Sequence, residues 1–240
     1  MAIRRVTWKQ AQRALISQIK RTHVLLDIGP GIQPKRYMLP AVHICVEPCR
    51  EYVSYLLKQT VTTGDDRNYV VLNCGWREAL PLFLPGSVDS IFLIDVVEHL
   101  EKQEGAELLR RTIPLARRQV VIVTPYGFMP QHHEDGRDLW GFHGGSWQEH
   151  RSGWDERDFD ETWDIYVVPE FYTRDNQGKP LDQPCGYMLA ILNLDGPRVR
   201  IRGLRMRLID LMSGSYHRMV SAYRWMREEV RALKRTETAS

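Results

Sequence analysis

The stretch His23-Val-Leu-Leu-Asp27-Ile-Gly29-Pro-Gly31 indicates the fold of this chain. A short apolar run that ends in an acid and is followed by glycines is typical of a buried strand entering a tight turn. Glycines at a strand-to-helix turn let the backbone approach a ligand closely, and the free N–H groups at the start of the next helix can bind it. The first functional expectation is therefore a ligand site at this turn.

Four more apolar runs of the same kind follow along the chain, and helical patterns alternate with them. The runs are Val42–Glu47, Tyr69–Asn73, Ser90–Asp95 and Gln119–Thr124, and the helical patterns cover residues 7–20, 51–58 and 98–110. Strands that are apolar throughout and alternate with helices predict a parallel sheet with helices on both faces. Ligands bind such sheets beyond the carboxyl ends of the strands.

The regular alternation stops after residue 126. Residues 127–163 are rich in Gly, His, Trp and charge, and a loop this long in a compact domain is usually a lid or a binding loop. Two more strands are predicted at Asp164–Val168 and Tyr187–Asn193. The segment between them contains the turn-forming stretch Asn176–Pro180 and is too short for a helical crossover, so we expect the two strands to pair antiparallel.

Composition and charge divide the chain into a body and a tail. The 240 residues are 43% hydrophobic and 26% charged, which is typical of a globular protein and excludes collagenous or disordered classes. Residues 197–240 carry a net charge of +7 and residues 1–196 a net charge of −4. We therefore expect one domain over residues 1–196, beginning with a helix within residues 1–20, and a basic helical extension over residues 197–240.

The extension has an apolar stripe at heptad spacing between Tyr216 and Leu233, with basic residues beside it. A helix of this kind over residues 204–234 packs on its own domain, pairs in a homodimer, or docks on a membrane surface or a complex. The basic residues form no recognisable nucleic-acid module and the body is acidic, so no nucleic-acid partner is expected.

Other sequence features predict a reduced, cytoplasmic protein. The four cysteines form no CxxC pair, which argues against a zinc site. The N-terminus lacks the apolar core of a signal peptide, and no apolar run approaches the roughly 18 residues of a membrane span.

Glu47 stands 20 residues after Asp27, at the end of the next predicted strand. A carboxylate at that position can accept hydrogen bonds from both hydroxyls of a ribose. The glycine turn and Glu47 together predict a nucleotide-like ligand. A dinucleotide-binding dehydrogenase is disfavoured, because its fingerprint needs a third glycine where this chain has Pro34.

Four motifs, in their order along the chain, resemble those of one family. Leu26-Asp-Ile-Gly-Pro-Gly31, Val46-Glu-Pro48, Ile94-Asp-Val-Val-Glu-His-Leu100 and Val123-Thr-Pro-Tyr-Gly127 resemble the class I methyltransferases that use S-adenosylmethionine (SAM), over about residues 20–195. His150-Arg-Ser-Gly-Trp154, followed by Asp158-Phe159, resembles a segment of small-molecule and sugar-modifying members. The resemblance implies a Rossmann-like α/β fold with a seven-stranded, mostly parallel sheet and an antiparallel last strand.

The resemblance also implies roles for residues near the strand ends. SAM would contact Asp27, Gly29 and Gly31 with its amino-acid and sulfonium part, Glu47 with its ribose, Pro48 with its adenine, and Asp95 and Val96 with its methionine moiety. Backbone groups of Asn73 or Cys74 would replace the family's usual acid beside the adenine. Trp76 either stacks on the base or belongs to the core.

Candidate groups for catalysis and acceptor binding lie after strands four and five. A base that takes the acceptor proton is expected at His132, His133 or His99, because histidine titrates near neutral pH. Each of these histidines could equally be structural. The acceptor is expected to contact Tyr126, His150, Arg151 and Trp154, of which Arg151 and Trp154 could instead anchor the loop. The stretch His132–Asp135 permits a divalent metal, but no metal site is assigned.

The sequence thus predicts methyl transfer from SAM to a small-molecule or glycan-type acceptor, most simply at oxygen. The alternative is a catalytically silent protein of this fold that acts as a scaffold or regulatory subunit through its C-terminal helix.

Overall fold

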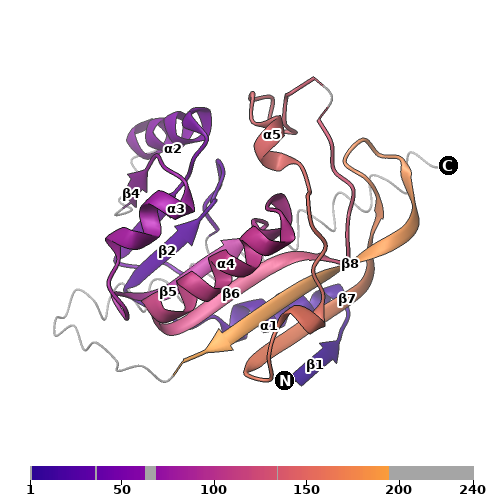
Figure 1. Cartoon of the computed structure of the whole chain (residues 1–240), viewed down its shortest axis with the longest axis horizontal. Helices are drawn as coiled ribbons and strands as arrows, with labels where there is room; N and C mark the ends of the chain where they lie inside the picture. The colour runs from indigo at the N-terminus through magenta and orange to yellow at the C-terminus, as the bar shows by residue number, and fades with distance from the viewer. Residues whose placement is uncertain (1, 36, 63–68, 134, 195–240) are drawn as a thin grey trace.

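The structure is a computed structural model that describes residues 2–35, 37–62, 69–133 and 135–194 (Figure 1). The basic extension predicted over residues 197–240, with its helix over residues 204–234, lies outside the described residues. Within the described part, no helix is long and apolar enough to cross a membrane.

One mixed sheet of eight strands forms the centre of the described structure, in the order β1-β7-β8-β6-β5-β2-β3-β4. The strands are β1 (Ala2–Arg5), β2 (Val24–Ile28), β3 (Val42–Val46), β4 (Tyr69–Leu72), β5 (Val88–Ile94), β6 (Ala116–Tyr126), β7 (Trp163–Arg174) and β8 (Pro180–Asn193). Strand β8 runs antiparallel to both β6 and β7, and the other neighbouring strands are parallel. The predicted parallel sheet and the predicted antiparallel pair are both confirmed.

The sheet differs from the prediction at one edge, where β1 adds an eighth strand. Ala2 to Arg5 pair in parallel with Asp164 to Val167 of β7. Arg4 also forms an ion pair with Asp164, with 3.1 Å between Nη1 and Oδ1. Two consecutive arginines in a four-residue strand leave too little apolar pattern for this edge to be predicted.

The helices lie on both faces of the sheet (Figure 1). They are α1 (Trp8–Gln18), α2 (Arg50–Thr62), α3 (Trp76–Ala79), α4 (Lys102–Thr112) and α5 (Gly145–Gln148), with short 3-10 turns η1 (Leu80–Leu82), η2 (Val97–His99), η3 (Ile113–Leu115) and η4 (Glu156–Asp158). Consecutive strand residues point to opposite faces, so Leu25 packs with α1 whereas Leu26 packs with α4.

Helix boundaries follow local chemistry. The predicted capping box is present: Gln10 N–H donates to Thr7 Oγ1, and Thr7 N–H donates to Gln10 Oε1. The helix predicted over residues 98–110 instead begins at Lys102, because the chain first makes the turn η2. This turn leaves His99 at the carboxyl edge of the sheet, beside the segment over residues 127–163.

Candidate functional site

Two cavities adjoin each other beyond the carboxyl ends of β2, β3 and β5. The Glu47 cavity, of about 310 Å³, is lined by Glu47, Pro48, Trp76, Val96 and Arg151, among others. The His150 cavity, of about 230 Å³, is lined by Lys35, Glu98, Gln131, Trp140 and His150, among others. Both cavities are lined by Gly29, Asp95, His99 and Gln148. Two ligands bound here would therefore meet at this shared wall.

Glu47 lies directly after β3 with only 3% of its surface exposed. Its Oε2 accepts from the N–H of Gly31, and its Oε1 accepts from the N–H of Cys49, both at 2.9 Å. Burial raises the pKa of Glu47 to about 7, although these two donors act in the opposite direction. Each carboxylate oxygen accepts more than one hydrogen bond, so a fixed Glu47 can still bind a diol.

The glycine turn is tight because side chains from other segments pack on it. Gly29 has a φ of +65°, and a Cβ there would lie 3.0 Å from Cγ2 of Val96. Gly31 has a φ of +58°, and a Cβ there would lie 2.9 Å from Cη2 of Trp140. The turn therefore needs glycine both for its left-handed backbone and for the close approach of these two side chains.

The end of β4 supports the floor of the Glu47 cavity. Asn73 Nδ2 donates to the carbonyl oxygens of Glu47 and Pro48 at 3.0 and 3.1 Å, which fixes the loop after β3. Cys74 packs against the core instead of lining either cavity. Trp76 belongs to the core and also lines the Glu47 cavity, with the Arg77 guanidinium 4.1 Å from its ring centroid.

Asp27 lies behind the glycine turn and lines neither cavity. It is 1% exposed, and its Oδ2 is 2.9 Å from Nε2 of His43 on the neighbouring strand. The structure thus places Asp27 in a buried pair that ties β2 to β3, and its contact with the amino-acid part of the cofactor stays a prediction.

Asp95 stands at the shared wall with a φ of 56°. Its side chain is 47% exposed, and this exposed surface faces the cavities. The surrounding protein raises the pKa of Asp95 by desolvation, and the Lys35 ammonium, 3.7 Å away, partly opposes that shift. The sequence did not predict Lys35 as a site residue, because the segment after Gly31 has no periodic pattern.

His99 and His150 face each other with ring centroids 4.9 Å apart. The Nδ1 atom of His99 is 3.1 Å from the carbonyl oxygen of Glu149, and that of His150 is 2.7 Å from the carbonyl oxygen of Met129. A carbonyl oxygen only accepts, so both Nδ1 atoms carry the proton. Burial lowers the pKa of each histidine to about 4, which leaves both rings neutral at pH 7.

Glu98 was not predicted as a site residue although it lies next to His99. It is 2% exposed, lines the His150 cavity, and its Oε2 has no hydrogen-bond partner in the described part of the chain. Burial raises the pKa of Glu98 well above its ordinary value, and the negative charge of Asp95 adds to the shift. The adjacent Glu98 and His99 in the motif Ile94–Leu100 are the sequence feature that could have indicated Glu98 as a site residue.

Two of the three predicted bases lie away from the cavities. His132 is exposed, and its carbonyl oxygen accepts from Nδ2 of Asn176 at 2.8 Å. His133 lines neither cavity, although its Nε2 is buried without a partner among the described residues. Only His99 of the three reaches the shared wall, because η2 turns it toward the cavities.

Residues 127–163, which we call the lid, are anchored on α2. The hydroxyl of Tyr52 donates to Oδ2 of the buried Asp138. Asp138 Oδ1 accepts from the N–H groups of Trp140 and Phe142 at 2.8 and 3.0 Å. These bonds hold Trp140 over the glycine turn, where it lines the His150 cavity.

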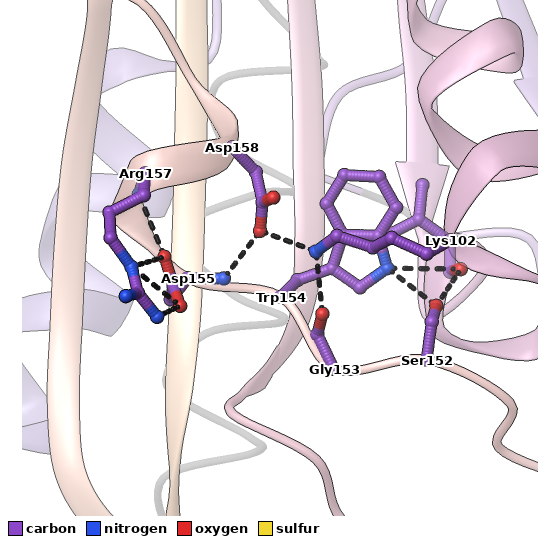
Figure 2. A network of polar contacts seen from close by, with 8 residues as sticks. Lys102, Ser152, Gly153, Trp154, Asp155, Arg157 and Asp158 are labelled. Atoms are coloured by element: carbon purple, nitrogen blue, oxygen red, sulfur yellow. Dashed lines mark hydrogen bonds and ion pairs between the residues drawn. The ribbon is translucent and has the colours of Figure 1, made fainter.

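A second anchor fixes the lid to α4 (Figure 2). The Trp154 ring is 1% exposed, and its Nε1 donates to the carbonyl oxygen of Val97 and to Oγ of Ser152. Lys102 lies over that ring at 4.0 Å and donates to the carbonyl oxygen of Gly153 and to Asp158. Trp154 therefore anchors the loop, which was one of its two predicted roles, and lines neither cavity.

The other residues that were predicted to contact the acceptor lie at different places in the structure. Tyr126 donates its hydroxyl to Glu156 at 2.5 Å, beside the second anchor, and lines neither cavity. Arg151 lines the Glu47 cavity, and its N–H donates to the carbonyl oxygen of Glu98 at 2.7 Å. His150 is the predicted acceptor contact that lines the smaller cavity.

Comparison with known proteins finds similarity in structure and not in sequence. No family model matches the chain, and no curated protein matches it. The [4+2]-cyclase SpnF superposes with a TM-score of 0.52 at 14% identity, over 80% of this chain and 84% of SpnF. The N-terminal domain of EvdMO1, solved with S-adenosylhomocysteine (SAH) bound, gives 0.49 at 11% identity over 78% and 79%.

Magnesium protoporphyrin IX methyltransferase from Synechocystis PCC 6803, solved with SAM bound, gives a TM-score of 0.43 at 12% identity, over 77% of this chain and 74% of that enzyme. The fold assignment rests on the superposition with SpnF and on the strand order, with its antiparallel β8 between β6 and β7. The chain has the Rossmann-like α/β fold of the class I SAM-dependent methyltransferases.

Proposed function

We propose that this chain binds SAM in the Glu47 cavity and transfers its methyl group to a hydroxyl of a small-molecule or glycan-type acceptor in the His150 cavity. The observation that carries the proposal is the shared wall of Gly29, Asp95, His99 and Gln148. A ligand in each cavity would meet the other there, and methyl transfer mainly needs proximity and in-line orientation.

The residues of the Glu47 cavity fit this cofactor. The fixed carboxylate of Glu47 offers acceptors for a ribose diol, and Pro48 and Trp76 offer apolar surface for a base. Gly29 lets Val96, which also lines this cavity, approach the turn closely. When bound, SAM supplies an electrophilic methyl carbon on a positively charged sulfur, and Asp95 at the shared wall favours positive charge nearby.

The His150 cavity supports a hydroxyl acceptor. The neutral rings of His99 and His150 have their Nδ1 protons committed to carbonyl oxygens, so each Nε2 lone pair is available to accept from a ligand. The anchored lid contributes Leu139 and Trp140 to the lining of this cavity. The resemblance of residues 150–154 and 158–159 to a segment of small-molecule and sugar-modifying members supports a small-molecule or glycan-type acceptor.

The fold alone does not determine the reaction, because SpnF is described as a [4+2]-cyclase. The second hypothesis is a catalytically silent scaffold or regulatory subunit. Binding and turnover must therefore be measured separately.

Calorimetry with SAM and SAH tests the cofactor. We expect both to bind, and Glu47→Ala to weaken binding by ~1–3 kcal/mol, because two donors of the ribose lose a charged acceptor. Glu161→Ala, at an exposed acid outside both cavities, is the matched control and should not change the affinity. Absence of binding by the wild type at ~100 μM, a concentration that detects even weak ligands, would reject the proposal.

Turnover is tested by SAH formation with a panel of hydroxylated acceptors, including mono- and disaccharides. Acceptor-dependent SAH formation supports the enzyme. Tight SAM binding without SAH formation on any acceptor of the panel would instead favour the silent scaffold.

A further inference from the structure

Three side chains with metal-binding atoms meet in the wall of the His150 cavity. Glu98, His99 and His150 each place one such atom within 4.8 Å of the other two, and all three residues line the cavity. They come from two distant segments of the chain, the turn after β5 and the lid. Two imidazoles and a carboxylate form a donor set that suits divalent transition-metal ions.

The two histidines are held in the orientation of metal ligands. Each donates its Nδ1 proton to a backbone carbonyl oxygen, His99 to Glu149 and His150 to Met129. Metal-binding histidines usually make this second hydrogen bond, because it fixes the ring and leaves Nε2 for the metal. With the proton on Nδ1, the lone pair of each ring is on Nε2, where a metal ion would bind it.

Glu98 provides an independent observation. Its side chain is 2% exposed, and its Oε2 has no hydrogen-bond partner among the residues that the structure describes. A buried carboxylate oxygen without a partner is energetically costly. A cation bound between Glu98 and the two histidines would satisfy it.

The other cluster of potential ligands in the described structure lacks these properties. Asp27, His43 and Cys45 also bring their ligand atoms within 4.8 Å, but all three are buried and line neither cavity. His43 Nε2 is already bonded to Asp27 Oδ2 at 2.9 Å. This cluster is therefore a satisfied contact between strands, whereas the first one opens on a cavity.

We infer that Glu98, His99 and His150 bind one divalent transition-metal ion in the wall of the His150 cavity. Three protein ligands leave coordination positions open toward the cavity, where water or a ligand hydroxyl can bind. No metal site was expected from the sequence, because His150 lies far along the chain from the Glu98-His99 pair and the His132–Asp135 stretch was the segment considered.

A role in catalysis follows if the proposed function holds. Glu98, His99 and His150 would hold the ion, which would lower the pKa of an acceptor hydroxyl bound to it, so that the hydroxyl could pass its proton to water. The acceptor oxygen would form its bond to the methyl carbon of SAM as the C–S bond breaks to leave SAH. The ion would thus fix and activate the acceptor.

The test is calorimetric titration of the chelator-treated full chain with Zn²⁺. We expect one ion per chain for the wild type. Removing a group that only hydrogen-bonds to a metal ligand costs roughly 10–100-fold in metal affinity. Glu98→Gln and His150→Gln change the ligands themselves, so each should weaken Zn²⁺ binding at least about tenfold. His23→Gln, at the opposite end of β2 from the cavities, should bind as the wild type does.

Co²⁺ NMR of the wild type tests the site without any substitution. The Nδ1 protons of two histidines, each held by a carbonyl oxygen, should appear as paramagnetically shifted signals when Co²⁺ is bound. Binding that is equal in all variants, or shifted signals from other histidines, would overturn the inference, as would a wild type that binds no Zn²⁺.

SAM calorimetry on the same variants separates this inference from the proposed function. Glu98 and His150 line the His150 cavity and not the Glu47 cavity, so both variants should keep the SAM affinity of the wild type. If the protein binds SAM but no metal ion, only the inferred metal site is rejected. If it binds a metal ion but not SAM, only the proposed methyltransferase function is rejected.

Discussion

At the scale of single residues, Glu47 shows how the fold adjusts a group for binding. Burial raises its pKa to about 7, and the N–H groups of Gly31 and Cys49 hold its two oxygens in place. Near pH 7 the carboxyl group is therefore partly protonated. Only the ionised form offers all of its oxygen lone pairs to the hydroxyls of a ribose.

This titration predicts a pH dependence of nucleoside binding. As pH rises from 6 to 8 through a pKa of about 7, Glu47 loses its proton and affinity for a ribose should rise, by about tenfold at most. Calorimetry with 5′-methylthioadenosine measures this rise without interference, because that ligand has no amino-acid group that titrates. Glu47→Gln should show no such rise, and an equal rise in this variant would assign the titration to another group.

Residue pattern predicted some site positions and not others. Glu47, Gly29, Val96 and Asp95 follow from strand ends and the glycine turn, because parallel strands bring their carboxyl ends to one edge. His132 and His133 lie outside both cavities, because the path of a loop without periodicity depends on tertiary contacts. Those contacts direct His150 toward the shared wall instead.

At the scale of elements, the lid depends on two anchors that come from different helices. Tyr52 of α2 holds Asp138, and Lys102 of α4 packs on Trp154 (Figure 2). Strands β2 to β6 and helices α2 and α4 were predictable from apolar periodicity. The anchors were not, because each joins groups that are distant in sequence through a few specific contacts.

Tyr52→Phe tests the first anchor. The change leaves Asp138 Oδ2 buried without its donor, so we expect unfolding free energy to fall by ~1–3 kcal/mol in denaturant titrations. Hydrogen exchange should accelerate at the amides of Trp140 and Phe142, which Asp138 holds. Tyr55→Phe, which also packs near Phe142 but takes no part in this anchor, is the control, and equal effects of both substitutions would contradict the anchor.

At the scale of the whole molecule, the described residues that line the two cavities all lie between Ile28 and Tyr172. We therefore expect the candidate site to form without residues 197–240 and their net charge of +7. We propose that the basic extension serves assembly, as a homodimer helix or a docking element for a membrane surface or a complex.

Shortening the chain to end at Ser213 tests this division of roles. The SAM affinity should stay unchanged within about twofold, since every described residue that lines a cavity is retained. Sedimentation of the full and the shortened chain at equal concentration reports the oligomeric state. A full chain and a shortened chain that sediment with the same number of subunits would end the homodimer hypothesis.

The shared wall of the two cavities has a consequence for how substrate range can change in evolution. A substitution at Gly29, Asp95 or His99 alters the surroundings of both ligands at once. Met129, Gln131, Leu139 and Trp140, in contrast, line only the His150 cavity and all belong to the lid. Under the proposed function, new acceptors could therefore be acquired by changing these four lid residues while the residues that line the Glu47 cavity stay the same.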